Sequence, residues 1–261
     1  MMQFSLVEQI ALAIFLLSGI SFFLYHLLLR LKIILKGKSD FSIDQLPKRI
    51  VRVFDEVILH KKVASGKRKS AGILHALVMY GFIFFGLITI NNFGMAFGLP
   101  IFSDSIRHTY FLFFGAPWAI LCSIGILGLA YRRFVIKPEA LGKFSSTSAI
   151  VSVFIVTLMV TYLIDEFHIL SGAAEKFNWW LHSGVIGGFL FLIPQSKHMH
   201  LVLSPFNIFL RPFEVPSHGA IPIDMEASEE ELDNLLLDLS RLSKDQALDI
   251  FTCVECGRCT D

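Results

Sequence analysis

The chain has 261 residues, of which 54% are hydrophobic and only 17% are charged, against roughly 25% charged residues in soluble domains. This composition argues against a soluble globular protein, and the formal net charge of +1 removes the main support for nucleic-acid binding. Three of the four cysteines stand close together near residue 261, which is typical of a metal site rather than of a disulfide framework. The fourth, Cys122, lies alone in an apolar tract and is interpreted as a small apolar side chain.

Five stretches without Asp, Glu, Lys or Arg reach the ~20 residues that a helix needs to cross the hydrocarbon core of a bilayer. They are Gln9–Leu29, Ala71–Ser103, His108–Tyr131, Phe144–Ile164 and Phe177–Ser196. The first stretch lacks the basic flank of a cleaved signal peptide, so we interpret it as a permanent anchor. The sequence therefore predicts an all-α membrane protein in which residues 1–203 form a bundle of five transmembrane helices in contact with lipid.

Basic residues predict the orientation of these spans. Ten of the 23 Lys and Arg residues lie between Lys36 and Lys69, and further basic residues follow the third and fifth spans. Because lysine and arginine collect in cytoplasmic loops, we expect a multi-pass protein of the inner (cytoplasmic) membrane, with its N-terminus outside and its C-terminus in the cytoplasm. In the loop 36–70, apolar residues recur at helical spacing from Leu46 to Ile58. This spacing predicts a short helix, lying either in the membrane interface or against a cytoplasmic domain.

The C-terminal part of the sequence has the pattern of an iron–sulfur protein. Residues 204–224, which contain four prolines, are predicted to form a linker, and residues 225–261 the start of an iron–sulfur domain. Cys253, Cys256 and Cys259 form C-x2-C-x2-C, which matches the first three ligands of a bacterial [4Fe–4S] motif. A zinc site or no metal at all are the alternatives. Because the fourth cysteine of that motif would follow beyond Asp261, we expect the chain to be the N-terminal fragment of a longer protein.

Histidine is costly inside a bilayer, so intramembrane histidines are candidate functional residues. His75 lies near the cytoplasmic end of the second span, and His200 closes the fifth span on the same side. This arrangement suits bis-histidine ligation of a b-type haem. His182, near the outer end of the fifth span, would share a face of one continuous helix with His200, about 27 Å away, and is a candidate ligand of a second haem. Its candidate partners are His108 and His168; for all of these histidines the alternative is an interfacial side chain that reaches water.

Several short motifs together resemble the membrane-bound iron–sulfur oxidoreductases of the heterodisulfide-reductase type, which include the electron-transfer-flavoprotein:menaquinone oxidoreductases. The motifs are Gly72-x-x-His75, Trp179-Trp180-x-His182, Ser196-Lys197-x-x-His200, Pro205-x-Asn207, Gly219-Ala220-x-Pro222-Ile223-Asp224 and Cys253-x-Glu255-Cys256-Gly257-Arg258-Cys259. The membrane part is similar to the five-helix gamma subunit of respiratory nitrate reductase. The nitrate-reductase pattern has two histidines on its second helix, whereas this sequence has one.

The resemblance implies a function and a set of ligands. His75 and His200 would ligate the haem nearer the cytoplasm, His182 would belong to a distal haem, and a ferredoxin-like domain would begin with the [4Fe–4S] cysteines. Electrons would pass between a cytoplasmic donor, namely an electron-transferring flavoprotein or another redox partner, and menaquinone in the membrane. The alternative function is that of a non-catalytic haem-b membrane anchor for a separate cytoplasmic oxidoreductase.

Overall fold

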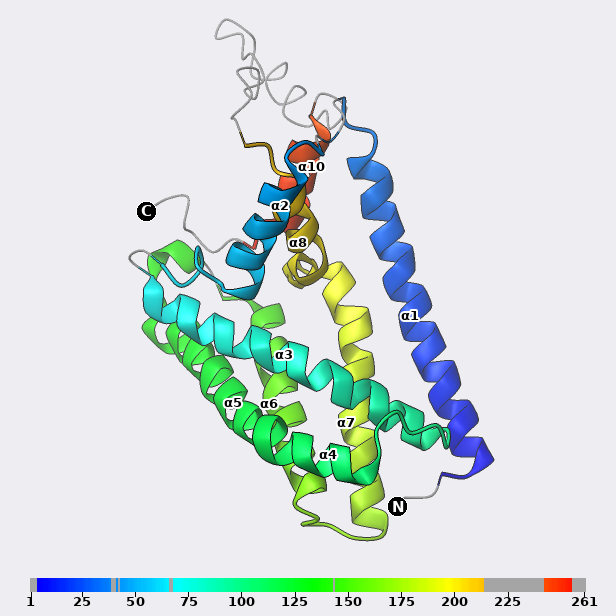
Figure 1. Cartoon of the computed structure of the whole chain (residues 1–261). Coiled ribbons are helices and arrows are strands. Elements are labelled where there is room, and N and C mark those ends of the chain that lie inside the picture. The colour runs from blue at the N-terminus through cyan, green and yellow to red at the C-terminus, as the bar shows by residue number, and fades with distance from the viewer. Residues whose placement is uncertain are drawn as a thin grey trace, which may run out of the picture. The chain divides into compact units, whose positions relative to one another are not determined.

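A computed structural model describes residues 4–38, 41, 43–65, 68–142, 144–213 and 242–254, and the regular structure in these residues is entirely helical (Figure 1). The chain divides into two compact units. Unit 1 contains the described residues of Met1–Ser21 and Lys62–Phe191. Unit 2 contains those of Phe22–Lys61 and Leu192–Cys256. The all-α class predicted from the sequence is confirmed for the described residues.

Among the described residues, four helical segments are long and apolar enough to cross a membrane. They are α1 (Leu6–Ile34), α3 (Lys69–Ala96), the continuous run Asp104–Ile136 and α6 (Ser146–Glu166). The run Asp104–Ile136 consists of α4 (Asp104–Tyr110), a π-helical turn (Phe111–Gly115), α5 (Ala116–Tyr131) and a second π-helical turn (Arg132–Ile136). The fifth predicted span corresponds to α7 (Ala173–Leu192), whose first half carries charged and amide side chains and is less apolar than the other four.

Small residues bring α3 and α5 close together in unit 1, where the two helices run side by side (Figure 1). A Cβ atom added at Gly81 of α3 would lie 2.9 Å from both Cβ and Sγ of Cys122 on α5. A Cβ atom added at Gly125 would lie 2.7 Å from the backbone oxygen of Leu74. Helix backbones in lipid approach closely where side chains are small, because packing rather than hydrophobic burial drives their association. Cys122, which is 3% exposed, therefore acts as the small apolar packing residue that the sequence predicted.

Replacing Gly125 with leucine is expected to destabilise unit 1. The new side chain meets backbone rather than a flexible side-chain end, so α3 and α5 must move apart, at a cost of about 1–3 kcal/mol. Gly86 provides the matched control, because it lies on α3 with no atom within 4 Å of an added Cβ. Thermal unfolding in detergent should show a lower midpoint for Gly125→Leu than for Gly86→Leu. Equal midpoints would contradict the close packing of α3 on α5.

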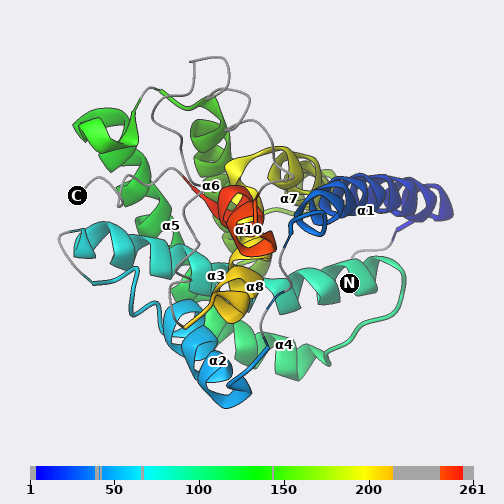
Figure 2. The same ribbon diagram turned by 90° about the horizontal axis from the view of Figure 1, so that it is seen from above.

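Unit 2 is built around a small apolar core. Its helices are the second part of α1, α2 (Leu46–Val53) with the π-helical turn Phe54–Ile58, α8 (His200–Leu210) and α10 (Lys244–Thr252). The core consists of Ile34, Met199, Leu203, Ala247 and Leu248. The short helix predicted in the loop 36–70 is confirmed. It packs beside α8, as Figure 2 shows, and leaves Leu46, Ile50 and Phe54 exposed.

The helix of the fifth predicted span ends earlier than the sequence indicated. It stops at Leu192, and two 3₁₀ turns, Ile193–Gln195 and Lys197–Met199, lead to α8. Pro194 lacks a backbone N–H and its ring clashes with the carbonyl four residues earlier, and Ser196 is extended, with φ −130° and ψ 172°. The prediction that His182 and His200 share one continuous helix is therefore wrong. His200 does not close the fifth span but begins a separate helix. This helix continues through Pro205 to Leu210, although residues from 204 onward were expected to form a linker.

Candidate functional site

The His182 ring on α7 is held by a hydrogen bond to α6. Its Nδ1 lies 2.7 Å from Thr161 Oγ1. Thr161 Oγ1 also lies 2.7 Å from the carbonyl oxygen of Thr157, which only accepts, so we assign the single hydroxyl proton to that carbonyl. The Thr161 oxygen then accepts from His182 Nδ1–H, and the imidazole lone pair is on Nε2. Histidines that ligate metals usually have their other ring nitrogen held in this way.

Two buried polar residues complete the surroundings of His182. Thr161 and Asn178 are both buried, and Asn178 Nδ2 donates to the backbone oxygen of Thr161 at 2.9 Å. Sequence reasoning identified His182 but neither of these residues. A sequence signal for both residues exists, because a hydroxyl and an amide side chain stand at helix positions whose neighbours are mostly apolar.

His200 has the same tautomer as His182. Its Nδ1 lies 3.0 Å from the backbone oxygen of Lys197, and because a carbonyl only accepts, Nδ1 carries the proton and Nε2 the lone pair. Burial lowers the pKa of His200 below its ordinary value, although the hydrogen bond to the Lys197 carbonyl opposes this shift. The neutral imidazole is the form that binds a metal, so the environment of His200 favours a ligand.

His75 lies on α3 one turn after Gly72, and its side chain is half-buried. Gly72 is buried, and a Cβ atom there would overlap the backbone oxygen of Val63 and lie 2.6 Å from its carbonyl carbon. Glycine is therefore required where the chain that enters α3 crosses the start of the helix. His75 belongs to unit 1 and His200 to unit 2, so their pairing stays a prediction.

The two candidate partners of His182 lie at exposed positions. His108 lies on α4, and His168 follows α6 with φ 52°, in the left-handed region. Both assignments remain predictions.

Cys253 is exposed and directly follows α10. Cys256 and Cys259 lie outside the described residues, and within the described ranges no three His, Cys, Asp or Glu side chains gather as a metal site. The first turn of α10 is fixed by a capping box, in which Ser243 Oγ accepts from the Gln246 N–H at 3.1 Å and Gln246 Oε1 accepts from the Ser243 N–H at 2.9 Å. Of the predicted cysteine motif, the structure therefore describes the first ligand only.

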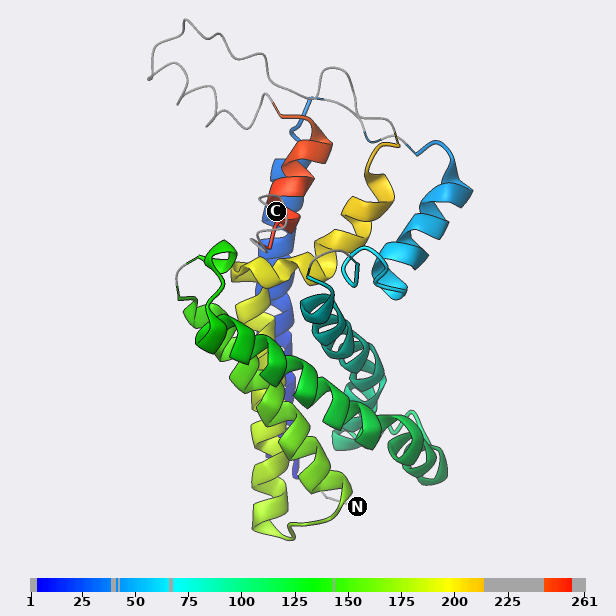
Figure 3. The same ribbon diagram turned by 90° about the vertical axis from the view of Figure 1, so that its left-hand side faces the viewer.

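The helix that begins with His200 packs against the helix that ends before Cys253 (Figure 3). Asn207 on α8 donates from Nδ2 to Asp249 Oδ1 at 2.7 Å and to Thr252 Oγ1 at 3.1 Å. Asn207 is two turns from His200, about 10 Å along the helix axis, and Thr252 immediately precedes Cys253. The helix that begins with the predicted ligand His200 and the helix that precedes the predicted ligand Cys253 are thus joined by hydrogen bonds within unit 2. Sequence reasoning noted Asn207 only as part of a motif and did not foresee this role.

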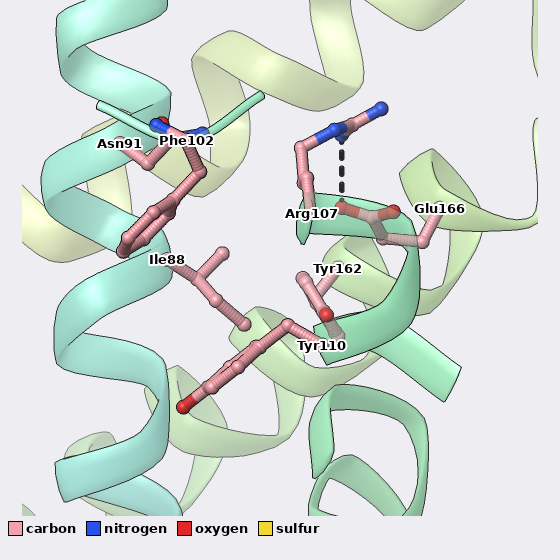
Figure 4. Close-up of a pocket in the computed structure, with 7 residues that line it drawn as sticks. All are labelled: Ile88, Asn91, Phe102, Arg107, Tyr110, Tyr162 and Glu166. Carbon is pink, nitrogen blue, oxygen red and sulfur yellow. Dashed lines mark hydrogen bonds and ion pairs between the residues drawn. The ribbon is translucent and has the colours of Figure 1, made fainter. Parts of the chain in front are cut away.

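A small pocket in unit 1 brings together α3, α4 and α6 (Figure 4). It is lined by Ile88, Asn91, Phe102, Arg107, Tyr110, Tyr162 and Glu166. Arg107 Nη1 forms an ion pair with Glu166 Oε1 at 3.1 Å, and the Glu166 side chain is only 5% exposed. Sequence reasoning proposed none of the three residues Arg107, Tyr110 and Tyr162 as functional, because charged and aromatic residues at the ends of membrane helices are common.

The fold and the cysteine motif define a class: in the part that the structure describes, the regular structure is helical and includes four apolar helices long enough to cross a membrane, and the sequence continues to cysteines at the spacing of an iron–sulfur protein. The chain is 30% identical over 269 residues to the "Probable iron-sulfur-binding oxidoreductase FadF" of Bacillus subtilis (strain 168), an alignment that covers 92% of this chain and 37% of the relative. It is 22% identical over 295 residues to the "EtfAB:quinone oxidoreductase" of Syntrophomonas wolfei, covering 95% of this chain and 39% of that protein.

The chain thus spans less than two fifths of the length of these curated relatives. Both relatives have names of oxidoreductases, and one name includes iron–sulfur binding, in agreement with the class predicted from the motifs. No protein-family model matches the chain, and no solved structure matches it either. The similarity to the gamma subunit of nitrate reductase stays a prediction.

Proposed function

We propose that the chain is the membrane and electron-entry part of an iron–sulfur oxidoreductase that passes electrons between an electron-transferring flavoprotein and menaquinone. The names of the two relatives support an iron–sulfur cofactor, a flavoprotein partner and a quinone substrate. In this proposal α7 is the fifth membrane span, the N-terminus lies outside, and the basic loop 36–70, α8 and α10 lie on the cytoplasmic side.

The residues have distinct roles in this proposal. The thiolates of Cys253, Cys256 and Cys259 hold three irons of a [4Fe–4S] cluster, with a fourth ligand from a further residue. His75 and His200 would hold a b-type haem, and His182 would be a ligand of a second one. These groups supply one-electron transfer when bound, while the protein sets their order and their surroundings. The tautomers of His182 and His200, with the lone pair on Nε2, support their assignment as ligands.

The contact between α8 and α10 is the main structural support for this proposal. A redox protein must hold successive cofactors at a short and constant separation. The Asn207 hydrogen bonds and the core around Leu203 and Leu248 join the helix of His200 to the helix that precedes Cys253.

The proposal is tested by cofactor analysis of the full-length protein that contains this chain. After purification in detergent, we expect a b-type difference spectrum between the reduced and oxidised states, with at least one haem per chain, together with protein-bound iron and acid-labile sulfide. Reduced electron-transferring flavoprotein, added without oxygen, should reduce the haem, and Cys253→Ser should abolish this reduction while the haem stays bound. Haem that is present but not reduced through Cys253 would favour the non-catalytic anchor instead. A folded preparation without haem would contradict both functions.

A further inference from the structure

The helix α2 presents an exposed apolar face. Four large apolar side chains at its surface are 50–59% exposed: Leu46, Ile50, Val51 and Phe54. Leu46, Ile50 and Phe54 follow one another at intervals of four residues, so they lie along one side of the helix. Exposed apolar side chains that are grouped in this way, rather than scattered singly, mark a surface that binds something.

The opposite face of α2 is polar and already has its partner in α8, beside which α2 lies (Figure 2). Arg49, which is 0% exposed, donates to the backbone oxygen of Phe209 at 2.7 Å, and Arg52 donates to that of Arg211 at 2.6 Å. Glu56 forms an ion pair with the Arg211 side chain at 2.6 Å. A surface helix of a soluble domain usually packs through its apolar face. In α2 this arrangement is reversed, because the polar face packs and the apolar face is left outside.

The segment that contains α2 is strongly basic. Residues 36–69 include ten lysines and arginines but only four acidic residues. Two of the four carboxylates, those of Asp44 and Asp55, are paired with neighbouring cations of the same segment, and Lys38 and Lys48 are exposed. Lysines beside an apolar helix face are attracted to the anionic head groups of a cytoplasmic leaflet. The charge of the segment therefore complements a lipid surface.

The chain on both sides of α2 leads into a helix long enough to cross a membrane. Eleven residues (35–45) separate α2 from α1, and ten residues (59–68) separate its π-helical turn from α3. Even when fully extended, connections of this length reach at most about 40 Å. With α1 and α3 in the membrane, both connections start at the same membrane surface, so they keep α2 close to that surface.

The length and composition of α2 favour lipid over a soluble protein as the occupant of the apolar face. α2 and its π-helical turn have 13 residues, about 20 Å, which is too short to cross a hydrocarbon core of about 30 Å but sufficient to lie along its edge. A transient interface with a soluble protein is only about as apolar as the rest of a protein surface. The exposed face of α2 is instead aliphatic and aromatic.

We propose that α2 lies in the cytoplasmic head-group region of the membrane, where its exposed apolar side chains insert among the acyl chains of anionic lipids. The hydrogen bonds from Arg49 and Arg52 to the carbonyls at the end of α8 then hold α8 at the membrane surface. This inference rests on the part of the proposed function that places α1 and α3 in the membrane. It does not depend on haem, iron–sulfur cluster or quinone.

The test places the photoreactive amino acid p-benzoylphenylalanine at single positions of the full-length protein, in nanodiscs of phosphatidylcholine and phosphatidylglycerol. On irradiation it bonds covalently to a neighbouring C–H group, and mass spectrometry identifies the adduct as lipid or protein. Phe54 is the test position, because the replacement keeps its phenyl ring. Lys48 is the matched control, since it is exposed on the same helix but lies about 120° around it from Phe54. Leu17, 64% exposed on α1, reports whether α1 is in the membrane.

We expect about fivefold more lipid adduct at position 54 than at position 48, because the apolar face of an interfacial helix lies about 5–10 Å deep. Lipid adducts are also expected at position 17. Nanodiscs of phosphatidylcholine alone should give less adduct at position 54 and the same yield at position 17. An unchanged yield at position 54 would overturn the preference for anionic lipid.

The remaining outcomes separate the inference from the proposed function. Lipid adducts at position 17 but not at position 54 would overturn the inference and leave the membrane placement of α1 intact. Equal yields at positions 48 and 54 would also overturn it, because the apolar face would then have no preference for lipid. Adducts at position 54 with added electron-transferring flavoprotein, in place of lipid, would assign the face to a protein partner. No lipid adduct at either position 17 or position 54 would contradict the membrane placement itself, and the inference with it.

Discussion

Replacing His200 with alanine is expected to remove the haem that we assign to His75 and His200. Alanine has no atom that binds iron, and a haem held by one remaining axial ligand dissociates readily or changes its spectrum. The measurement is the haem content per chain and the reduced-minus-oxidised spectrum of the detergent-purified protein. A protein with one haem should lose nearly all of its b-type absorbance, and a protein with two should lose about half, with the rest attributable to His182.

His198 provides the control for this experiment. Its ring centroid lies 6.3 Å from that of His200, and it belongs to the same 3₁₀ turn that leads into α8. Its Nδ1 lies 3.2 Å from Ser196 Oγ, and His198 is not among the predicted haem ligands. His198→Ala should therefore keep the parent haem content. Equal haem loss in both variants would point to damage of the local fold, and full haem retention in His200→Ala would contradict the assignment of His200.

Replacing Arg49 with alanine is expected to destabilise unit 2 by about 3 kcal/mol. The Arg49 side chain is 0% exposed and donates from its three nitrogens to Asp44, to the backbone oxygen of Phe209 at 2.7 Å and to that of Arg211 at 3.1 Å. The last two acceptors are carbonyls at the C-terminal end of α8, which have no partner within that helix. Alanine removes the Arg49 donor from the Phe209 carbonyl, leaves the Arg211 carbonyl with Arg52 as its donor, and opens a cavity. The Asp44 carboxylate is 58% exposed, so its charge returns to water, and the loss stays below that of a fully buried pair.

Thermal unfolding in detergent measures this effect, with an expected decrease of the midpoint by roughly 5–10 °C. Arg52→Ala is the graded control. Arg52 makes one hydrogen bond to the Arg211 carbonyl at 2.6 Å and lies 3.7 Å from the centroid of the Phe213 ring, so its loss should cost only about 1 kcal/mol. Arg49→Lys keeps the charge but not the fork of donors and should fall between the two. An Arg49→Ala protein as stable as the parent would contradict the role of Arg49 in holding the end of α8.

The class of the protein follows from local properties of the sequence. Long tracts without charged residues predict membrane-length helices, because backbone groups in lipid must be paired within the segment. Four of the five expected tracts are helices of the required length and apolarity, and the fifth is a helix with a more polar first half. The motif from Cys253 to Cys259 indicates a metal site from spacing alone, since three thiolates in one short segment reach neighbouring irons.

The errors arose where one residue changes the direction of the chain. A tract without charges from Phe177 to Ser196 contains Pro194, and the sequence pattern treated this tract as a single helix. The helix ends at Leu192, so the shared helix face predicted for His182 and His200 does not exist. A hydropathy pattern does not reveal this break, because hydropathy measures side-chain polarity and does not include the backbone N–H that proline lacks.

The sequence by itself predicted the helical class, the long apolar tracts, the cysteine motif and the histidines that are candidate ligands, because each depends on residue type and spacing along a short segment. Only the tertiary structure decided how the surroundings are arranged: the proton on His182 Nδ1, the coupling of α8 to α10, and the Tyr162 hydroxyl, which has no hydrogen-bond partner among the described residues. These depend on partners far apart in the chain, such as Thr161 and His182, 21 residues apart, or Arg49 and Arg211, 162 residues apart. A hydrogen bond requires two atoms within about 3 Å at a defined angle, and no pattern along the chain specifies that geometry until the helices have packed.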